Sequence, residues 1–373
     1  MIMMYILQFF FIKLINVNYC LKYETGFRNI CIFTLNKFMK KKSLYILFIV
    51  PFILLSLNGC QYDSMSPYNN NGISMTLVSA FGTAGTGVNV FAKKINTTDY
   101  GFLSLGTAGM EIINITNPAS PTSVSDYPVY GYSEEVFVAN LNDTSYAFVA
   151  AGTGGISVLN LSNITAPTLD TILNLNGDYI NSVFVDTASK MLYAGGSSRK
   201  VYIINLSNLP AIGNINTYTT FSYINEILVD NNVAYIAQDS GVDIINVTNP
   251  ISPVGLAQGI TYDYAYDVKK AGNYILLSNN TYGVLIINVS NPSRPLEVGV
   301  LDTYDIALAC SVNGNLVYVA EDATGVETFD ISNPSRPILV AFSNTSSFSE
   351  NVCYFNGFVY VSDYNDYLVL RYP

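Results

Sequence analysis

The segments Val317-Tyr318-Val319-Ala320-Glu321 and Val326-Glu327-Thr328-Phe329-Asp330-Ile331, with the turn Ser332-Asn333-Pro334-Ser335-Arg336-Pro337 after them, decide the fold. β-Branched and aromatic residues dominate both segments and favour strands, whereas Asn and Pro in the turn interrupt them. The same turn recurs along the chain at intervals of about 42 residues. Its copies begin at Asn117, Asn163, Asn249, Asn291 and Asn333, and a degenerate copy is Asn208-Leu209-Pro210.

Each repeat contains four short apolar segments. A Val-rich segment precedes the Tyr-centred one, and a further segment follows the second proline of the turn, as in Pro295-Leu296-Glu297-Val298-Gly299. We name the four segments A, B, C and D in chain order. Four short strands in a repeat of this length predict a β-propeller, and outside residues 39–59 no segment has a sustained helical period. We therefore expect an all-β fold made of four-stranded antiparallel blades.

The number of blades follows from the B segments. Seven of them carry a central tyrosine: Tyr100, Tyr146, Tyr193, Tyr235, Tyr274, Tyr318 and Tyr360. The last repeat ends after segment C, and residues 74–81 form a lone D segment before the first A. We predict that residues 74–373 form a seven-bladed propeller whose closing blade combines this N-terminal strand with the last three strands, which leaves no open edge between first and last blades.

The B, C and D segments resemble the LVIVD repeat of bacterial and archaeal surface proteins over about residues 74–373. The resemblance implies a propeller in an extracellular setting and no particular reaction. The Asp that is usual in the C segment of that family is present at Asp330 alone. Because Asn replaces it elsewhere, we expect this position to bond backbone amides of the turn instead of a metal. The replacements are Asn114, Asn160, Asn205, Asn246 and Asn288.

The N-terminal part has the pattern of an export signal. Residues 39–59 begin with Met39 and three lysines and continue with an apolar run to Leu57, which is typical of a signal peptide and is short for a bilayer span. The ending Leu57-Asn58-Gly59-Cys60 resembles a lipobox, which implies acylation of Cys60; an ordinary cleavage beside a chance cysteine is the alternative. We interpret residues 1–38 as lying upstream of the native start; an anchor helix retained at the N-terminus is the alternative. We interpret residues 60–73 as a flexible tether.

Composition excludes several functions. The 373 residues carry a net charge of −10, which disfavours a nucleic-acid partner, and they include no His, which excludes His-based catalysis and metal binding. No pair of acids stands out, so we expect no enzyme and no catalytic residues; a carboxylate-dependent glycan-active enzyme and a purely structural surface protein are alternatives. We expect no cofactor or metal; calcium at the acidic residues is the alternative, although the sequence has no calcium motif. Cys310 and Cys353 share one register in strand A, and we interpret them as buried small residues, with a disulfide as the alternative.

The expected binding site is one face of the ring. In a four-stranded meander the D–A and B–C loops share a face, and in every repeat except the first, which has Ala84, an aromatic residue lies four positions before the apolar start of strand A. These aromatics are Tyr132, Tyr179, Tyr223, Tyr264, Tyr304 and Phe348. The acids Glu135, Glu226 and Asp267 come directly before strand A, and Asp239, Asp322 and Asp363 lie in B–C loops. We predict a rim that binds a protein, peptide or glycan, on a monomeric lipoprotein anchored at the outer membrane or cell surface. The alternative is that the aromatics pack between blades and the acids cap loop amides.

Overall fold

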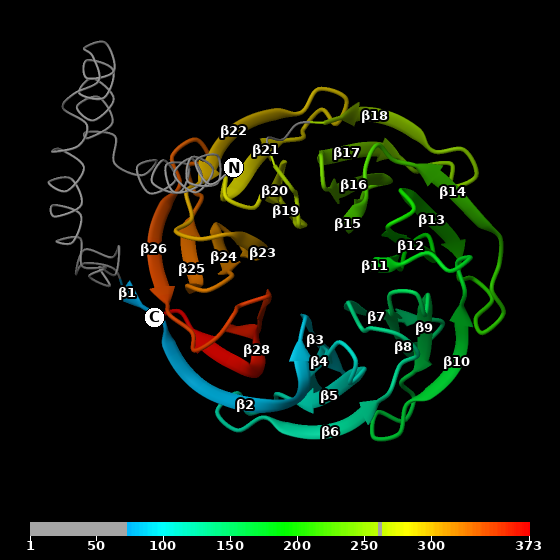
Figure 1. The fold of residues 1–373 in the computed structure, drawn as a ribbon, viewed down its shortest axis with the longest axis horizontal. Coiled ribbons are helices and arrows are strands. Elements are labelled where there is room, and N and C mark those ends of the chain that lie inside the picture. Colours follow the sequence, from blue (N-terminus) through cyan, green and yellow to red (C-terminus); the bar gives the residue numbers. More distant parts are fainter. Residues whose placement is uncertain (1–72, 260–262) are drawn as a thin grey trace, which may run out of the picture. The chain divides into compact units, whose positions relative to one another are not determined.

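The computed structural model describes residues 73–259 and 263–373, which form seven sheets arranged around a central axis (Figure 1). All regular elements in these residues are strands. The first three blades are β3 (Asn89–Ile95), β4 (Thr98–Ser104), β5 (Met110–Asn114) and β6 (Thr122–Tyr127); β7 (Glu135–Leu141), β8 (Thr144–Ala150), β9 (Ile156–Asn160) and β10 (Thr168–Leu173); and β11 (Ile180–Asp186), β12 (Met191–Gly196), β13 (Lys200–Asn205) and β14 (Ile215–Thr219).

The next three blades follow the same order. They are β15 (Ile224–Asp230), β16 (Val233–Gln238), β17 (Gly241–Asn246) and β18 (Val254–Gln258); β19 (Asp267–Ala271), β20 (Tyr274–Ser278), β21 (Val284–Asn288) and β22 (Leu296–Leu301); and β23 (Ala307–Asn313), β24 (Leu316–Glu321), β25 (Gly325–Asp330) and β26 (Ile338–Ser343). In every blade strand A is innermost and strand D is outermost (Figure 1). The predicted seven-bladed propeller is therefore confirmed.

The seventh blade joins the two ends of the described chain. It contains β27 (Asn351–Phe355), β28 (Phe358–Arg371) and β2 (Thr76–Gly87), in the order β2-β28-β27. Strand β28 supplies both segment B and segment C, and β2 pairs with it antiparallel, with Leu77 opposite Leu370 and Phe81 opposite Tyr367. The composite closing blade is thus confirmed. A short strand that the sequence did not predict, β1 (Ile73–Ser74), pairs parallel with β26 and makes blade 6 five-stranded.

The core lies between neighbouring blades. Phe102 and Ile112 of blade 1, for example, pack in one cluster with Val136 and Val149 of blade 2, and all four are at most 1% exposed. Burial of these aliphatic and aromatic side chains from water stabilises each blade-to-blade contact. The A–B connection between β15 and β16 is a tight hairpin. Its two residues, Asn231 and Asn232, both have positive φ (50° and 61°), as a two-residue turn of the primed type requires.

Two further sequence expectations concern the cysteines and the N-terminal segment. Cys310 and Cys353 are both free thiols, so the disulfide alternative is wrong. Cys60, the signal peptide at 39–59 and the tether up to residue 72 lie outside the described residues. Within the part that the structure describes, no helix has the length and hydropathy to cross a bilayer.

Candidate functional site

The ring has two faces that are built from different connections. We call the face of the D–A and B–C loops the loop face, and the face of the A–B and C–D connections the turn face. Isolated bridges join B–C loops to the neighbouring D–A loop or to the strand A that follows it, as between Gly106 and Ser133 and between Asn280 and Ala307. The D–A and B–C loops therefore share one face, as predicted.

The turn face repeats one local hydrogen bond. At the end of strand C, Asn114 Oδ1 accepts a hydrogen bond from the Thr116 N–H at 2.9 Å, and Asp330 Oδ1 accepts one from the Ser332 N–H at 2.7 Å. A hydrogen bond from the Ser332 side chain, and then this backbone bond, lower the pKa of Asp330 below its usual value. The same bond is made by Asn160, Asn205, Asn246 and Asn288. The expectation that this position bonds turn amides is confirmed, and it explains why Asn and Asp interchange there.

Charge is divided between the two faces. In the described chain outside the strands, the loops of the loop face carry one basic residue, Arg199, and eight acids. The connections of the turn face carry one acid, Asp143, and three basic residues, Lys190, Arg294 and Arg336. The eight acids are Glu134, Asp178, Asp239, Asp263, Asp302, Asp305, Asp322 and Glu350. The loop face is therefore the acidic side of the propeller.

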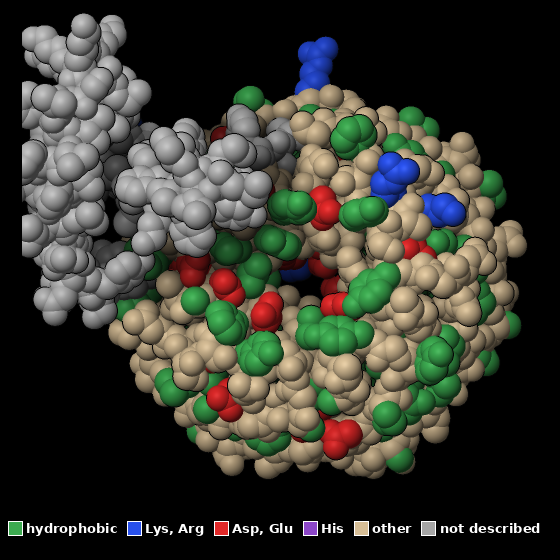
Figure 2. Space-filling model, viewed as in Figure 1, with side chains coloured by type: hydrophobic (Ala, Val, Ile, Leu, Met, Phe, Trp, Pro, Cys, Tyr) green, Lys and Arg blue, Asp and Glu red, His purple; other side chains and the backbone are tan. Residues whose placement is uncertain are grey.

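Aromatic residues follow the same division. The described connections of the turn face contain no Phe or Tyr, whereas ten lie in the loops of the loop face. Exposed aliphatic residues such as Ile251 and Leu296 lie instead on the C–D turns and the outer D strands. A view along the axis shows hydrophobic and acidic side chains gathered around the central opening (Figure 2). The ten are Tyr130, Tyr132, Tyr179, Phe221, Tyr223, Tyr264, Tyr266, Tyr282, Tyr304 and Phe348.

The six predicted aromatics divide into two groups. Four are exposed on the loop face: Tyr223 (52%), Tyr264 (48%), Tyr304 (51%) and Phe348 (45%). Tyr132 and Tyr179 are half-buried. Their rings lie over Gly106 and Gly152, where an added Cβ would approach the ring to 2.8 Å and 3.0 Å, and the Tyr179 hydroxyl donates a hydrogen bond to Glu134. These two tyrosines therefore pack between neighbouring loops, and the other four offer free ring surface.

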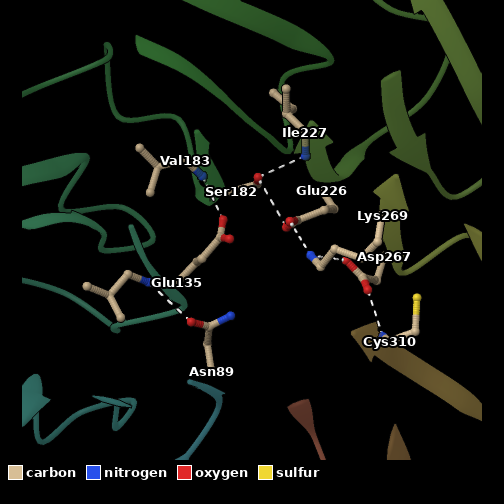
Figure 3. A network of polar contacts seen from close by, with 10 residues as sticks. Asn89, Glu135, Ser182, Val183, Glu226, Ile227, Asp267, Lys269 and Cys310 are labelled. Carbon is tan, nitrogen blue, oxygen red and sulfur yellow. Dashed lines mark hydrogen bonds and ion pairs between the residues drawn. The ribbon is translucent and has the colours of Figure 1, made fainter. Parts of the chain in front are cut away.

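The three acids predicted to circle the mouth lie inside the central channel instead. Glu135 begins β7, Glu226 lies within β15 and Asp267 begins β19, so each belongs to an innermost strand. Glu135 Oε2 accepts the Val183 N–H at 2.8 Å and Asp267 Oδ2 accepts the Cys310 N–H at 2.8 Å (Figure 3). Each of these bonds reaches the next blade. Their placement on the rim was wrong because the strands begin earlier than the first apolar residue suggests.

Lys269 completes this channel network. Its Nζ lies 3.0 Å from Glu226 Oε1 and 2.6 Å from Asp267 Oδ1 (Figure 3). Burial alone would lower the pKa of Lys269, but the charges of Asp267, Glu226 and Glu135 outweigh it and hold the pKa well above its usual value. Burial, and then the charge of Glu226, raise the pKa of Glu135 well above its usual value. The ammonium group thus occupies the place between the carboxylates where another cation would bind.

The three predicted acids of the B–C loops have different surroundings. Asp363 is fully buried and accepts hydrogen bonds from the Ser347 N–H and the Ser349 hydroxyl, so it caps a D–A loop. Asp239 Oδ1 accepts a hydrogen bond from Asn225 Nδ2 at 3.1 Å. Asp322 is half-buried, and burial followed by the charge of Asp305 raises its pKa. Asp239 and Asp322 therefore remain at the surface of the loop face.

A pair of acids in blade 6 was missed by the sequence analysis. Glu321, at the end of β24, lies beside Glu327 in β25, and both are at most 3% exposed. Burial, and then the hydrogen bond and charge of Glu327, raise the pKa of Glu321 to about 10. Blade 4 has Gln238 and Asp243 at the same register positions. Glu321 and Glu327 do not stand out as a pair in the sequence, because only the β24–β25 pairing register brings them together.

The chemistry of the described residues favours binding. Among residues 73–259 and 263–373, no group of three or more Cys, Asp or Glu side chains is arranged to hold a metal ion. The Glu321–Glu327 pair is buried beneath the loops, out of reach of a substrate. What the loop face offers at its surface is aromatic rings and carboxylates.

Comparison with protein-family models gives the LVIVD repeat. The match covers residues 143–174, 223–257, 263–303 and 306–345, which correspond to blades 2, 4, 5 and 6. Blades 2, 4, 5 and 6 of this propeller are LVIVD repeats. The family resemblance seen in the B–D segments is thereby confirmed, and LVIVD repeats account for four of the seven blades directly. A comparison with curated proteins gave no match.

Solved structures similar to this LVIVD-repeat propeller share its fold at low sequence identity. Raptor from Chaetomium thermophilum matches 81% of this chain with a TM-score of 0.63 and 11% identity, and the chain spans 30% of that protein. U3-55K matches 80% of the chain and 98% of its own length, with a TM-score of 0.61 and 10% identity. The WD40 repeats of RRP9 match 81% of this chain and 99% of their own length, with a TM-score of 0.61 and 10% identity. These similarities extend to the fold alone.

Proposed function

We propose that this protein is a binding module whose ligand-contacting surface is the loop face. One observation carries the proposal: the aromatic residues of the described connections lie on the loop face and are absent from the turn face. Four of the predicted rings, Tyr223, Tyr264, Tyr304 and Phe348, stay about half exposed, which packing between blades does not require. Exposed aromatic rings on loops that a rigid scaffold holds are typical of recognition surfaces.

The class of ligand that fits this surface is a protein, a peptide or a glycan. Rings such as Tyr223 and Tyr264 offer flat apolar area for stacking on sugar rings or side chains. An acidic surface disfavours nucleic acid, whose phosphates it would repel. We propose no enzymatic activity; the Glu321–Glu327 carboxylate pair is buried, whereas glycoside cleavage needs two carboxyl groups that reach the substrate.

We further propose that the propeller is presented at the cell surface by a lipid on Cys60. The support is the sequence pattern of residues 39–60, a basic start followed by an apolar run and a lipobox-like ending. Metabolic labelling with a palmitate analogue tests this proposal: the chain should be labelled and the Cys60→Ser variant should not. Equal labelling of both forms would refute lipidation at this residue.

The binding proposal is tested by one double substitution on the loop face and one away from it. The full chain, purified in mild detergent, is compared with the Tyr223→Ala/Tyr264→Ala variant on a glycan array and on an array of peptides. Both tyrosines are about half exposed, so we expect the unfolding midpoint to stay and binding to fall at least tenfold. The matched control is Ile251→Ala/Ile338→Ala, which removes exposed apolar area elsewhere and should leave binding unchanged. Loss of folding in the tyrosine variant, with binding per folded molecule retained, would show that the rings serve packing.

A further inference from the structure

The most exposed stacked ring pair of the loop face lies in the D–A loop before β19. Tyr264 and Tyr266 are 48% and 37% exposed, and their rings are stacked with centroids 6.5 Å apart and planes 18° from parallel. Ala265 between them is fully buried. The chain therefore turns its small residue inward and presents two adjacent phenol rings to solvent.

Hydrogen bonds fix the backbone of this loop. The Ala265 N–H donates to the Gln238 carbonyl at 3.1 Å, and the Tyr266 N–H donates to the Ser278 carbonyl at 2.8 Å. Asn225 Nδ2 donates both to the Ala265 carbonyl at 3.0 Å and to Asp239 Oδ1 at 3.1 Å. One amide thus ties the ring pair to an acid of the neighbouring blade. A surface held in this way loses little conformational entropy when a ligand binds.

Carboxylates lie beside the two rings on more than one loop. Burial raises the pKa of Tyr266, and the charges of Asp263, Asp239 and Asp322 raise it further. The charge of Asp322 also adds to burial in raising the pKa of Glu350. These acids belong to loops of blades 4, 5, 6 and 7, so their fields overlap across the loop face.

This negative charge has little internal compensation. The salt bridges between described residues involve Lys94, Lys269 and Lys270, and none of them includes Asp239, Asp322 or Glu350. Arg199, the one basic residue in the described loops of this face, belongs to blade 3. A ligand that brings positive charge to the surface therefore gains attraction that the protein itself does not supply.

We propose that Asp239, Tyr264, Tyr266, Asp322 and Glu350 form a docking patch for a cationic peptide segment. An Arg or Lys side chain of the peptide stacks on the Tyr264–Tyr266 pair, where the ring faces attract a cation, and neighbouring basic residues pair with the carboxylates. Charge complementarity selects this occupant, because a neutral glycan could donate hydroxyl hydrogen bonds to the acids but would leave their charge uncompensated. The inference rests on the proposed binding role of the loop face and names its ligand.

The test uses the full chain in mild detergent and fluorescein-labelled acetyl-(Gly-Arg)₄-amide, with Gln and Glu versions of the same peptide as controls. Binding is measured by fluorescence polarisation at several salt concentrations. We expect binding of the Arg peptide that weakens with salt, and none of the Gln or Glu peptide. The Asp239→Asn/Asp322→Asn variant keeps side-chain size and should bind at least tenfold more weakly. Asp143→Asn/Glu297→Gln removes the same charge from exposed positions away from the patch and should bind as the unaltered protein does.

A second variant separates stacking from charge. Tyr264→Leu/Tyr266→Leu keeps apolar area and all acids, and it should bind the Arg peptide about fivefold more weakly, because it lacks the ring quadrupole. Equal binding of the Arg and Gln peptides, or equal loss in both charge variants, would overturn the inference. If the arrays show a ligand that needs Tyr264 but ignores Asp239 and Asp322, the binding role stands and the cationic ligand is wrong. If the loop-face tyrosines affect no ligand on any array, the binding role itself fails.

Discussion

The loop face and the turn face are made by the same repeat, yet their connections have opposite compositions. The turn face repeats an Asn or Asp side chain that accepts a turn amide, and its loops contain no aromatic residue among those described. The loop face varies from blade to blade and carries the aromatic residues and most of the loop acids. The difference agrees with a turn face that closes each blade, and it supports our proposal that the loop face binds other molecules. Substitutions should therefore change stability on one face and binding on the other.

The largest expected effect on stability lies in the channel between the faces. Lys269→Met leaves Glu226 and Asp267 without their ammonium partner, so we expect the unfolding free energy at neutral pH to fall by about 2–3 kcal/mol, discounted because Lys269 is 33% exposed. The loss should shrink in acid, where the carboxylates become protonated. Chemical denaturation at neutral and at acidic pH measures the two unfolding free energies.

The exposed Lys200→Met is the matched control and should change stability by less than about 0.5 kcal/mol. Adding Asp267→Asn to Lys269→Met should recover part of the loss. An unaltered midpoint for Lys269→Met would show that the channel network does not hold the blades together.

Glu321 should give the next largest effect, through the pH dependence of stability. Its pKa rises from 4.5 to about 10 on folding, so the folded chain holds a proton that the unfolded chain releases, and stability falls as pH rises through this range. Glu321→Gln does not titrate and matches Gln238 of blade 4. We expect its unfolding free energy to exceed that of the unaltered chain by about 1–3 kcal/mol near pH 9 and to approach it near pH 5.

Guanidinium titrations across this pH range provide the measurement. Glu297→Gln removes an exposed acid and should follow the unaltered chain at every pH. Parallel curves for the Glu321→Gln variant and the unaltered chain would mean that Glu321 is ionised in the folded protein.

The smallest effect on stability is expected on the turn face. It distinguishes loss of the turn-amide acceptor from exchange of Asn for Asp. Asn246→Ala removes the acceptor for the Thr248 N–H, which lies at 2.8 Å, and should lower the unfolding free energy by about 1 kcal/mol. Asn246→Asp keeps the acceptor, as Asp330 does in blade 6, and should change it by less than about 0.5 kcal/mol. Ligand binding should be unaffected in both. Thermal unfolding of the Asn246→Ala and Asn246→Asp variants measures the change in stability, and a binding assay is run beside it. Reduced ligand binding by either variant would contradict a purely structural role of the turn face.

The sequence was sufficient for the architecture because the repeat carries it. Seven Tyr-centred segments and a lone strand at 74–81 predicted the blade count and the closing pair, since each unit repeats the same alternation of apolar residues and turn residues. The pairing of Ile73–Ser74 with β26 could not be predicted, because two residues show no periodicity.

The candidate site was predicted in part. The four exposed aromatics were found from their spacing, whereas Glu135, Glu226 and Asp267 were placed at the mouth because an acid at or near the start of an inner strand interrupts the apolar pattern. Asp267 and Lys269 are two residues apart and hence on one side of a strand, a signal that could have revealed the channel ion pair. Glu321 and Glu327 needed the β24–β25 register, which the turn length alone does not give.

The most direct test of the two-face account is hydroxyl-radical labelling of the chain in its native envelope and after purification in detergent. We predict that Tyr223, Tyr264 and Tyr304 are labelled less in the envelope than in the purified chain, because a ligand covers the loop face there. The outer-strand residue Leu296 should be labelled equally in both preparations. Equal labelling of the three tyrosines in both preparations would contradict the assignment of the loop face as the binding surface.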